Sequence, residues 1–228
     1  GLVRYGKDGG YVPALARSWE VRDDAKQWTF TLRDGLTFHD GSVCDAEAVR
    51  LSLTRMARPD KGYTLGAPGV WYQYLGDASI EALDPLTLRI TLSRPIADLL
   101  DILVYGYVVA PSSLDALEAG DTTRPVGTGP YRLVGYDPQH EIRLERFDGW
   151  HGTPPANKAL CFRLERDASR RLDMLLSGEA QLTNSLDFRA SQALAATADH
   201  TRVVSLVPVA IIYLFNAARG PLADPRVR

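Results

Sequence analysis

The segment that most constrains the fold is Gln27–Gly41, QWTFTLRDGLTFHDG, where apolar side chains recur at every second position. Apolar and polar residues alternate in QWTFTL and again in GLTF, so each run predicts a strand with one buried face. A two-residue loop would place Leu32 opposite Thr37 and bring an apolar face against a polar one. A three-residue loop pairs Leu32 with Leu36 and gives Gly35 the left-handed conformation of a bulge. The sequence therefore predicts a β-hairpin across this segment.

Patterns of the same kinds continue along the chain. Period-two alternation predicts strands, whereas apolar residues three or four positions apart predict helices. Asp45 is placed to cap the first helix. Beyond the linker-like stretch 119–130, strands alternate with helices as in an α/β layer, whereas the first part is rich in hairpins. After the first hairpin we expect a helix to about Ala57, a hairpin of Ser79–Leu83 with Thr87–Leu92, helices over Ile96–Val104 and from Ser112 or Ser113 to Gly120, a hairpin of Tyr131–Tyr136 with Glu141–Arg146, a strand over Leu160–Leu164, a helix from an Asp167 cap to Ser177, a strand over Ala180–Asn184, a helix near Phe188–Thr197, and strands over Val203–Val207 and Val209–Asn216.

The composition is that of a globular protein, with 45% hydrophobic and 24% charged residues and a formal net charge of −2. Lys and Arg are scattered and form no basic stripe with interleaved aromatic residues, so we expect no nucleic-acid partner. No apolar run approaches the ~20 residues that span a bilayer. The longest, Val203–Phe215, is interrupted by Ser205 and Pro208 and predicts two buried strands.

The sequence carries none of the usual catalytic or metal-binding patterns. Its four histidines have no zinc-ligand spacing, and it contains no Gly-x-Ser-x-Gly elbow. The stretch Gly127–Pro130 lacks the Lys-Ser/Thr of a phosphate-binding loop, and its proline removes an amide that such a loop would use. We therefore expect no catalytic residue, no metal and no cofactor. Cys44 and Cys161 are interpreted as unpaired buried thiols, although their spacing leaves a disulfide open.

Aromatic side chains gather in the predicted loop 58–76, which has no clear period. With Trp71 and Tyr72, the segment carries more aromatic side chains than a solvated loop needs. Two interpretations of these rings are open. The rings either pack over the neighbouring hairpin or form a wall of a ligand cleft, because amphipathic rings offer rigid contact area with a polar tip. Tyr105 and Tyr107, which follow a predicted apolar helix, pose the same question.

Several segments match one family in the same order. They are VPALARSWEVRDDAKQWTFTLRDGLTFHDGSVCDAEAVRLSLTRM, then VGTGPYRLVGY, LERFDGWHG, RLDMLLSGEAQLTNS and YLFNAARGPLADPRVR. The chain thereby resembles the family 5 extracytoplasmic solute-binding proteins, the peptide-, dipeptide- and nickel-binding components of ABC importers. This resemblance implies a fold of the α/β class with an α+β mixed sheet, namely the first lobe of a type II periplasmic-binding-protein fold with an appended hairpin-rich subdomain.

The resemblance also implies a domain organisation. Residues 1–13 would begin the core lobe, 14–124 would form the appended subdomain, 125–208 would continue the core lobe, and 209–228 would start the hinge to a second lobe. Family members are longer and have two lobes, so we expect residues 1–228 to be part of a longer polypeptide with weak solute affinity on their own.

Three departures from the family pattern limit what the resemblance implies. Cys44 stands where the family usually has Phe or Tyr, Phe147 replaces a usual Asn, and Gln181 replaces a common acidic residue. The arginines that hold a metal chelator in the nickel-binding branch have no counterpart in residues 62–76 or 99–109. A peptide is therefore the default solute, with a nickel chelate, a sugar or an opine as the other classes.

The function implied by the resemblance is solute capture without catalysis. Two lobes would close on a small-molecule or peptide ligand and deliver it to the membrane permease subunits of the importer. The protein would be a monomer, periplasmic or extracellular, with or without a lipid anchor. Two other classes are a hydrolase domain, which would need a nucleophile beside a base, and a chaperone-like or sensory module, which would show an apolar patch outside the cleft.

Six residues of this chain are the expected ligand contacts. Trp71, Tyr72, Tyr105 and Tyr107 are expected as walls of the cleft. Asn184 and Ser185 are expected as polar contacts at the carboxyl end of a strand, where open α/β sheets place ligands. Asn184 also fits a helix cap for the segment that follows it.

Overall fold

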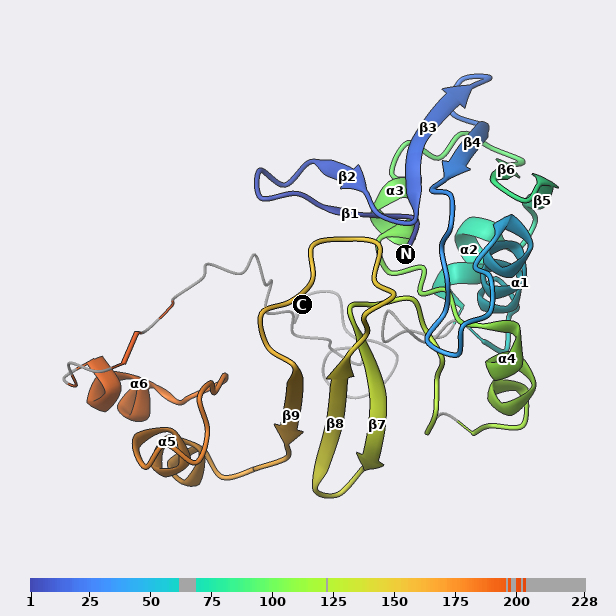
Figure 1. The fold of residues 1–228 in the computed structure, drawn as a ribbon. Helices are drawn as coiled ribbons and strands as arrows, with labels where there is room; N and C mark the ends of the chain where they lie inside the picture. The colour runs from blue at the N-terminus through green and yellow to red at the C-terminus, as the bar shows by residue number, and fades with distance from the viewer. Residues whose placement is uncertain (62–68, 122, 196, 198–199, 202, 204–228) are drawn as a thin grey trace, which may run out of the picture. The chain divides into compact units, whose positions relative to one another are not determined.

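The computed structural model describes residues 1–61, 69–121, 123–195, 197, 200, 201 and 203. It divides into two compact units, Gly1–Leu164 and Glu165–Arg228 (Figure 1). The boundaries expected at residues 13, 124 and 208 stay predictions. The first unit contains β1 (Val3–Tyr5), β2 (Tyr11–Pro13), β3 (Ala16–Arg22), β4 (Gln27–Leu32), α1 (Ala46–Met56), α2 (Val70–Leu75), β5 (Ser79–Asp84), β6 (Thr87–Thr91), α3 (Leu99–Leu103), α4 (Pro111–Glu118), β7 (Tyr131–Asp137), β8 (Glu141–Arg146) and β9 (Ala159–Arg163), and the second contains α5 (Ala168–Leu176) and α6 (Phe188–Ala195).

Every strand pair in the described ranges is antiparallel. β1 pairs with β2, the strands of a second sheet follow the order β3-β4-β6-β5, and a third sheet follows the order β7-β8-β9. The hairpins expected for β5 with β6 and for β7 with β8 are confirmed. The combination of helices with antiparallel sheets agrees with the expected mixed α and β fold.

β4 is the strand predicted at Gln27–Leu32, but it does not pair with the residues that follow Gly35. Its two edges are occupied by β3 and β6, so no edge is left for a local partner. The segment after Gly35 instead makes an isolated bridge between Thr37 and Val43. Leu36 and Phe38 are buried all the same. Gly35 has φ 69°, so its predicted left-handed conformation is confirmed while the predicted partner is wrong.

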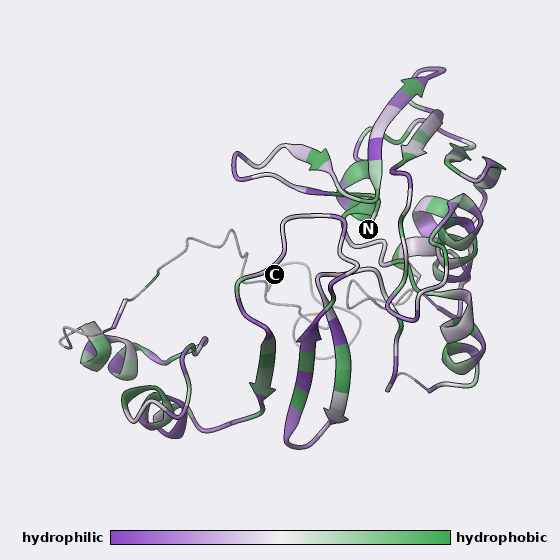
Figure 2. Cartoon of the chain, in the orientation of Figure 1, coloured by the Kyte–Doolittle hydropathy of each residue, from purple (hydrophilic) through white to green (hydrophobic). Residues whose placement is uncertain are grey.

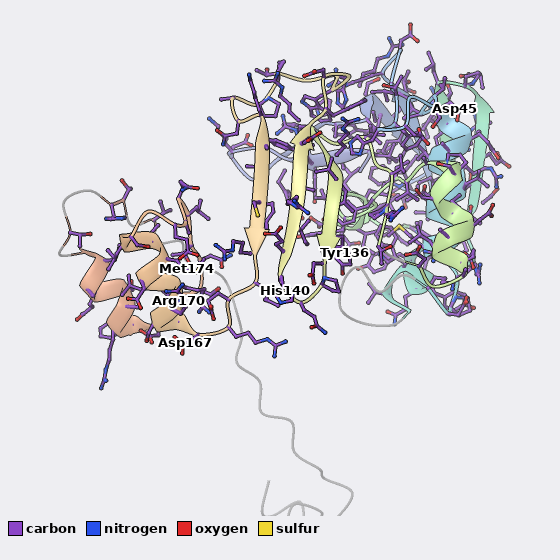
Figure 3. All side chains as sticks on the ribbon, turned by 60° about the horizontal axis from the view of Figure 1, so that its bottom comes forward. Asp45, Tyr136, His140, Asp167, Arg170 and Met174 are labelled. Carbon is purple, nitrogen blue, oxygen red and sulfur yellow. The ribbon has the colours of Figure 1, made fainter. Side chains whose placement is uncertain are left out.

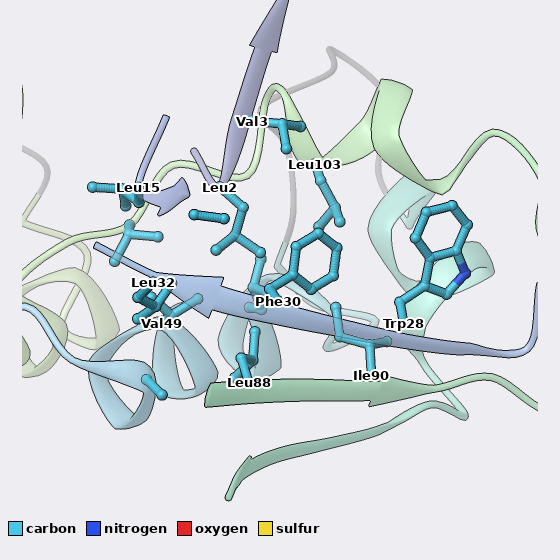
Figure 4. Packing of buried hydrophobic residues seen from close by; sticks show 14 of the residues in the cluster. Leu2, Val3, Leu15, Trp28, Phe30, Leu32, Val49, Leu88, Ile90 and Leu103 are labelled. Atoms are coloured by element: carbon cyan, nitrogen blue, oxygen red, sulfur yellow. The ribbon is translucent and has the colours of Figure 1, made fainter. Parts of the chain in front are cut away.

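The core of the first unit is built on the apolar faces of β4 and β6. Trp28, Phe30 and Leu32 alternate with half-buried polar residues, and Leu88 and Ile90 of β6 lie opposite two of them in register (Figure 4). α1 packs against β5 and β6 and contributes a buried apolar stripe. The apolar residues that recur every second position in the strands and about every 3.6 positions in the helix therefore pack into one core.

The sheet β7-β8-β9 has one apolar and one charged face, and the alternation can be followed along β8 in Figure 2. Leu133, Leu144 and Leu160 lie in register on the apolar face. The opposite face carries the exposed ion pair between Arg132 and Glu145, whose closest nitrogen and oxygen are 3.3 Å apart. The apolar face also carries Tyr136, Ile142 and Phe162 in register.

Two helix caps agree with the sequence. Asp45 precedes α1 and accepts a hydrogen bond from the Ala48 amide at 2.9 Å. Asp167 precedes α5 and accepts one from the Arg170 amide at 2.8 Å, and Figure 3 labels both residues along that helix. Each carboxylate satisfies an amide that has no partner within its helix.

The start of α4 differs from the prediction. α4 begins at Pro111 with Ala110 as its cap, because a proline at the first helical position needs no donor partner. Ser112 and Ser113, the expected caps, lie inside the helix. The Ser113 hydroxyl instead accepts from the Val126 amide at 2.9 Å.

Four other predictions are corrected by the structure. α3 is shorter than the expected 96–104 helix, and residues 180–184 form no strand. The predicted loop 58–76 contains the helix α2. Cys44 is buried as expected, whereas Cys161 is exposed on the charged face of β9, and both thiols are free. The strands expected over Val203–Val207 and Val209–Asn216 lie, apart from Val203, outside the described residues.

Candidate functional site

Trp71 is fully buried, at 0% exposure, and lies under the chain turn at Gly106. A Cβ atom at Gly106 would lie 3.2 Å from Trp71 Cη2 and 3.2 Å from Leu53 Cδ2. A larger residue here would make the indole or its neighbours shift by a few tenths of an ångström. The structure therefore favours the packing interpretation of Trp71, which supports a turn from beneath and does not present its ring as an exposed wall.

The turn above Trp71 displays two of the predicted tyrosines. The Tyr107 amide donates to the Tyr105 carbonyl at 2.9 Å, which closes a tight turn around Gly106. Tyr105 is 40% and Tyr107 56% exposed. Tyr72, on the outer face of α2, is 49% exposed. These three rings are available to a ligand, unlike that of Trp71.

A tyrosine pair that the sequence did not indicate lies beside α3. Tyr5 and Tyr11 are opposite each other in the β1-β2 ladder, and their ring centroids are 5.7 Å apart. Both hydroxyls donate to the same Asp101 oxygen, at 2.7 Å from Tyr5 and 2.5 Å from Tyr11. These hydrogen bonds raise the pKa of each phenol to about 12 and lower the pKa of Asp101. The charge of Tyr105 also acts on Tyr5, so this cluster adjoins the turn above Trp71.

We expect Asp101→Asn to bring the pKa of Tyr5 and Tyr11 down from about 12 toward the ordinary phenol value of about 10. The carboxylate accepts from the neutral phenol and repels the phenolate, and an amide does so far less. Because the folded pKa values are raised, their contribution to stability is complete below pH about 10 and falls as pH rises toward 12. Ultraviolet titration of phenolate absorbance measures the shift. Asp115→Asn, an exposed site on α4, should leave the titration curve unchanged, and so would Asp101→Asn if the cluster did not form.

A cavity of about 650 Å³ opens beside Tyr107 within the first unit. Its walls come from the N-terminal segment, the chain around Val104–Val109, the loop 125–129 and the apolar face of β7 and β8. The lining is mostly apolar, as is usual for small-molecule pockets of this size. The lining residues with polar groups in their side chains are Arg4, His39, Tyr107, Thr128, Tyr131, Tyr136, Trp150 and His151.

His39 fixes the loop on one side of this cavity. The Gly127 amide donates to His39 Nδ1 at 3.4 Å, so Nε2 carries the hydrogen that it donates to the Gly129 carbonyl at 3.0 Å. The His39 amide also donates to the Gly127 carbonyl at 2.9 Å. The stretch Gly127–Pro130 is therefore held in place by hydrogen bonds to His39. Burial, with the charge of Arg33 adding to it, lowers the pKa of His151 on the same cavity.

Asn184 and Ser185 belong to the second unit and are both exposed. Ser185 has φ 54°, a left-handed conformation that non-glycine residues rarely adopt. Arg171 holds this conformation, because its Nη2 donates to the Ser185 carbonyl at 2.8 Å while Nη1 donates to the Glu165 and Arg166 carbonyls at 2.9 Å each. The following helix is capped by Asp187, which accepts from the Ala190 amide at 2.8 Å, so the cap expected at Asn184 is wrong.

The described ranges hold neither a group of metal ligands nor a helix that could span a membrane. There, no three His, Cys, Asp or Glu side chains are grouped so that they share a metal ion. None of the helices in those ranges has the length and apolar character needed to cross a bilayer.

The fold is shared with solved periplasmic binding proteins. DppA from Helicobacter pylori, solved with the peptide STSA, is 27% identical with a TM-score of 0.73 over 87% of this chain and 43% of DppA. AgaA from A. tumefaciens R10, solved with agropinic acid, is 33% identical with a TM-score of 0.70 over 79% of this chain and 36% of AgaA. These matches define the fold as that of the periplasmic binding proteins.

The family follows from the sequence itself. The profile of the bacterial extracellular solute-binding proteins, family 5 (Middle), matches residues 10–228, and the chain belongs to this family. The glutathione-binding protein GsiB of Salmonella paratyphi A is 31% identical over 234 residues, which cover 100% of this chain and 44% of GsiB. The chain therefore spans less than half the length of this curated relative. The expected family and fold class are confirmed.

Proposed function

We propose that residues 1–228 are the first lobe of a solute-binding protein of an ABC importer, which captures a small solute between two lobes and delivers it to the membrane permease. The observation that carries this proposal is the family match over residues 10–228, supported by relatives that are named or solved as binding proteins. Domain closure on a ligand needs no bond-making, so the protein acts without catalysis.

The solute class that best fits is a peptide. Of the three ligands carried by the relatives, glutathione and STSA are peptides, whereas agropinic acid represents the opines. In this lobe the proposed ligand contacts are Tyr105 and Tyr107 on their turn. Tyr72, which follows Trp71 in the sequence, is a third proposed contact. Tyrosine rings cover apolar parts of a peptide and offer hydroxyls to its backbone.

The turn that displays these rings is preorganised. Trp71 supports Gly106 from below, and a hydrogen bond between the Tyr107 amide and the Tyr105 carbonyl closes it. A turn that is already fixed loses little conformational freedom when a solute binds. Asn184 and Ser185 remain proposed polar contacts, with Arg171 as the side chain that fixes the backbone at Ser185.

The remaining parts of the proposal follow from the family. The site of action is the periplasm or the cell exterior, the partner is the permease, and the protein works as a monomer. A hydrolase domain or a chaperone-like or sensory module is not favoured, because the relatives above carry solutes and peptides as binding proteins.

Isothermal titration calorimetry of the full-length gene product that contains this chain tests the proposal. We expect saturable binding of one of glutathione, a dipeptide or agropinic acid, and Tyr107→Ala to weaken it about tenfold or more, as loss of an aromatic anchor does. Leu83→Ala, at an exposed apolar position on β5, serves as the matched control and should not change the affinity. Absence of binding to all three, together with no small molecule co-purifying by mass spectrometry, would refute the proposal.

A further inference from the structure

A second cleft lies in the first unit, along the edge of β7. β7 ends its sheet in the described part of the chain, so one of its edges carries no neighbouring strand there. The cleft has a volume of about 690 Å³, within the range of about 300–1,000 Å³ typical of small-molecule sites. It is lined by His39 and Asp40, by Thr123–Val126 and by Arg132–Tyr136, whose Tyr136 is labelled in Figure 3.

The wall opposite β7 is fixed by hydrogen bonds to the rest of the first unit. The Val126 amide donates to Ser113 Oγ at 2.9 Å, and the Ala110 amide donates to the Val126 carbonyl at 2.8 Å. The next residue, Gly127, accepts from the His39 amide at 2.9 Å. The cleft is therefore formed before any ligand binds.

Two arginines bring positive charge to this cleft. Arg132 pairs with Glu145 at 3.3 Å, but both side chains are about half exposed, so water and salt weaken that pair. Arg124 makes no hydrogen bond or ion pair with the part of the chain that the structure describes, and its charge acts at longer range on Asp121. Both guanidinium groups are thus available to an anion.

The acidic side chain on the lining, Asp40, is already engaged. One of its oxygens accepts from the Ser42 hydroxyl at 2.6 Å and the Ser42 amide at 2.9 Å, and the other accepts from the Ser112 hydroxyl at 2.8 Å. These bonds, the Ser42 hydroxyl first, hold the pKa of Asp40 below its usual range. Asp40 therefore stays ionised, and within the described part of the chain it forms no ion pair with Arg124 or Arg132.

Besides these charged residues and the polar side chains of His39 and Thr123, the lining is largely apolar. Pro125 and Val126 form one side, and Leu133, Val134 and Tyr136 form the other. Val134 is 49% exposed and sits at the irregularity in the β7-β8 ladder between Leu133 and Gly135. Because this bulge interrupts the edge, it disfavours the addition of another strand and leaves room for a small molecule.

We propose that this cleft binds a small organic carboxylate. Its apolar body lies against Val126, Leu133 and Val134, and its carboxylate meets the guanidinium groups of Arg124 and Arg132. Arginine suits this task because its planar fork matches the two oxygens of a carboxylate. The cleft shares His39, Pro125, Leu133 and Tyr136 with the cavity beside Tyr107, but Arg124 and Arg132 line the cleft alone. The inference therefore does not depend on the function proposed above.

Titration of the isotope-labelled protein with phenylacetate, followed by NMR, tests the inference. We expect saturable shifts of the methyl signals of Val126 and Val134, which line this cleft and not the cavity beside Tyr107. Phenylacetamide has the same shape without the charge and should produce no saturable shift. The double variant Arg124→Gln, Arg132→Gln should bind phenylacetate about tenfold or more weakly, because charged hydrogen bonds to the ligand are lost. Arg17→Gln, at an exposed position on β3, should bind as the wild type does.

Three results would overturn the inference. They are equal binding of phenylacetamide, an unchanged affinity in the double variant, and saturable shifts at Val104 and Val108 in place of those at Val126 and Val134. The melting temperature of the double variant should match the wild type, because both arginines are exposed. If the double variant does not fold, Arg124→Gln alone and the comparison of phenylacetate with phenylacetamide decide the question.

Discussion

Replacing Trp71 by alanine is expected to lower the free energy of unfolding by about 3–5 kcal/mol, the range measured for the truncation of fully buried large aromatics. The indole is completely buried, and its tip lies where a side chain at Gly106 would have to fit. The substitution leaves a cavity that the α2 backbone cannot fill. Urea denaturation followed by far-ultraviolet circular dichroism measures the loss.

The neighbouring tyrosine provides the matched control for Trp71→Ala. Tyr72 lies on the same helix but is 49% exposed, so Tyr72→Ala should change stability by about 0.5 kcal/mol or less. Similar losses for the two variants would show that α2 is not packed as described. In the folded fraction of Trp71→Ala, solute affinity of the full-length protein should also fall, because the Tyr105–Tyr107 turn has lost its support.

The different environments of Trp71 and Tyr72 explain why the sequence left their roles open. α2 is only six residues long, Val70–Leu75, and follows a Gly-rich stretch, so its period is too short to stand out. Within it Trp71 and Leu75 are the buried residues, four positions apart, as one helical face requires. An aromatic count alone measures how much ring surface a segment carries and does not say which ring faces the core.

The first predicted hairpin shows a related limit. The alternation in Gln27–Leu32 correctly identified a strand and its buried face, and Gly35 correctly identified a left-handed turn. Pairing was inferred from the nearest apolar run, although the ladder partners lie at 16–22 and 87–91. Both edges of β4 are satisfied by these strands, so the short run after Gly35 finds no free edge. The local alternation of apolar residues determines which face of a strand is buried, whereas competition among distant strands determines which strands pair.

The candidate site depends on contacts between residues far apart in the sequence. Asp101 accepts from Tyr5 and Tyr11, which are 96 and 90 positions away. Tyr105 and Tyr107 flank Gly106, whose close approach to Trp71 no spacing rule indicates. The sequence did offer one signal for the pair Tyr5 and Tyr11. These tyrosines flank a Gly-rich turn, and a hairpin there brings them together. Residue types suggested a tyrosine-lined surface, but only the fold shows which tyrosines share it.

The pairing of β4 leads to the second large expected effect. Phe30→Ala should lower the free energy of unfolding by about 3–5 kcal/mol, because the ring is at 0% exposure in the central part of the sheet. Phe30 lies in register with Trp19 of β3 on one side and with Leu88 of β6 on the other. Loss of the ring therefore weakens both ladders together, and native-state hydrogen exchange should show faster exchange of amides in β3 and β6.

Thr29→Ala is the matched control, since Thr29 is the adjacent β4 residue on the opposite, half-buried face. It should change stability by about 0.5 kcal/mol or less, as substitutions outside the core do. If β4 instead paired with the residues after Gly35, Phe30→Ala would speed exchange around Leu36 and Phe38 and leave β6 protected. Faster exchange in β6, with Thr29→Ala unchanged, is the pattern required by a strand held between two distant partners.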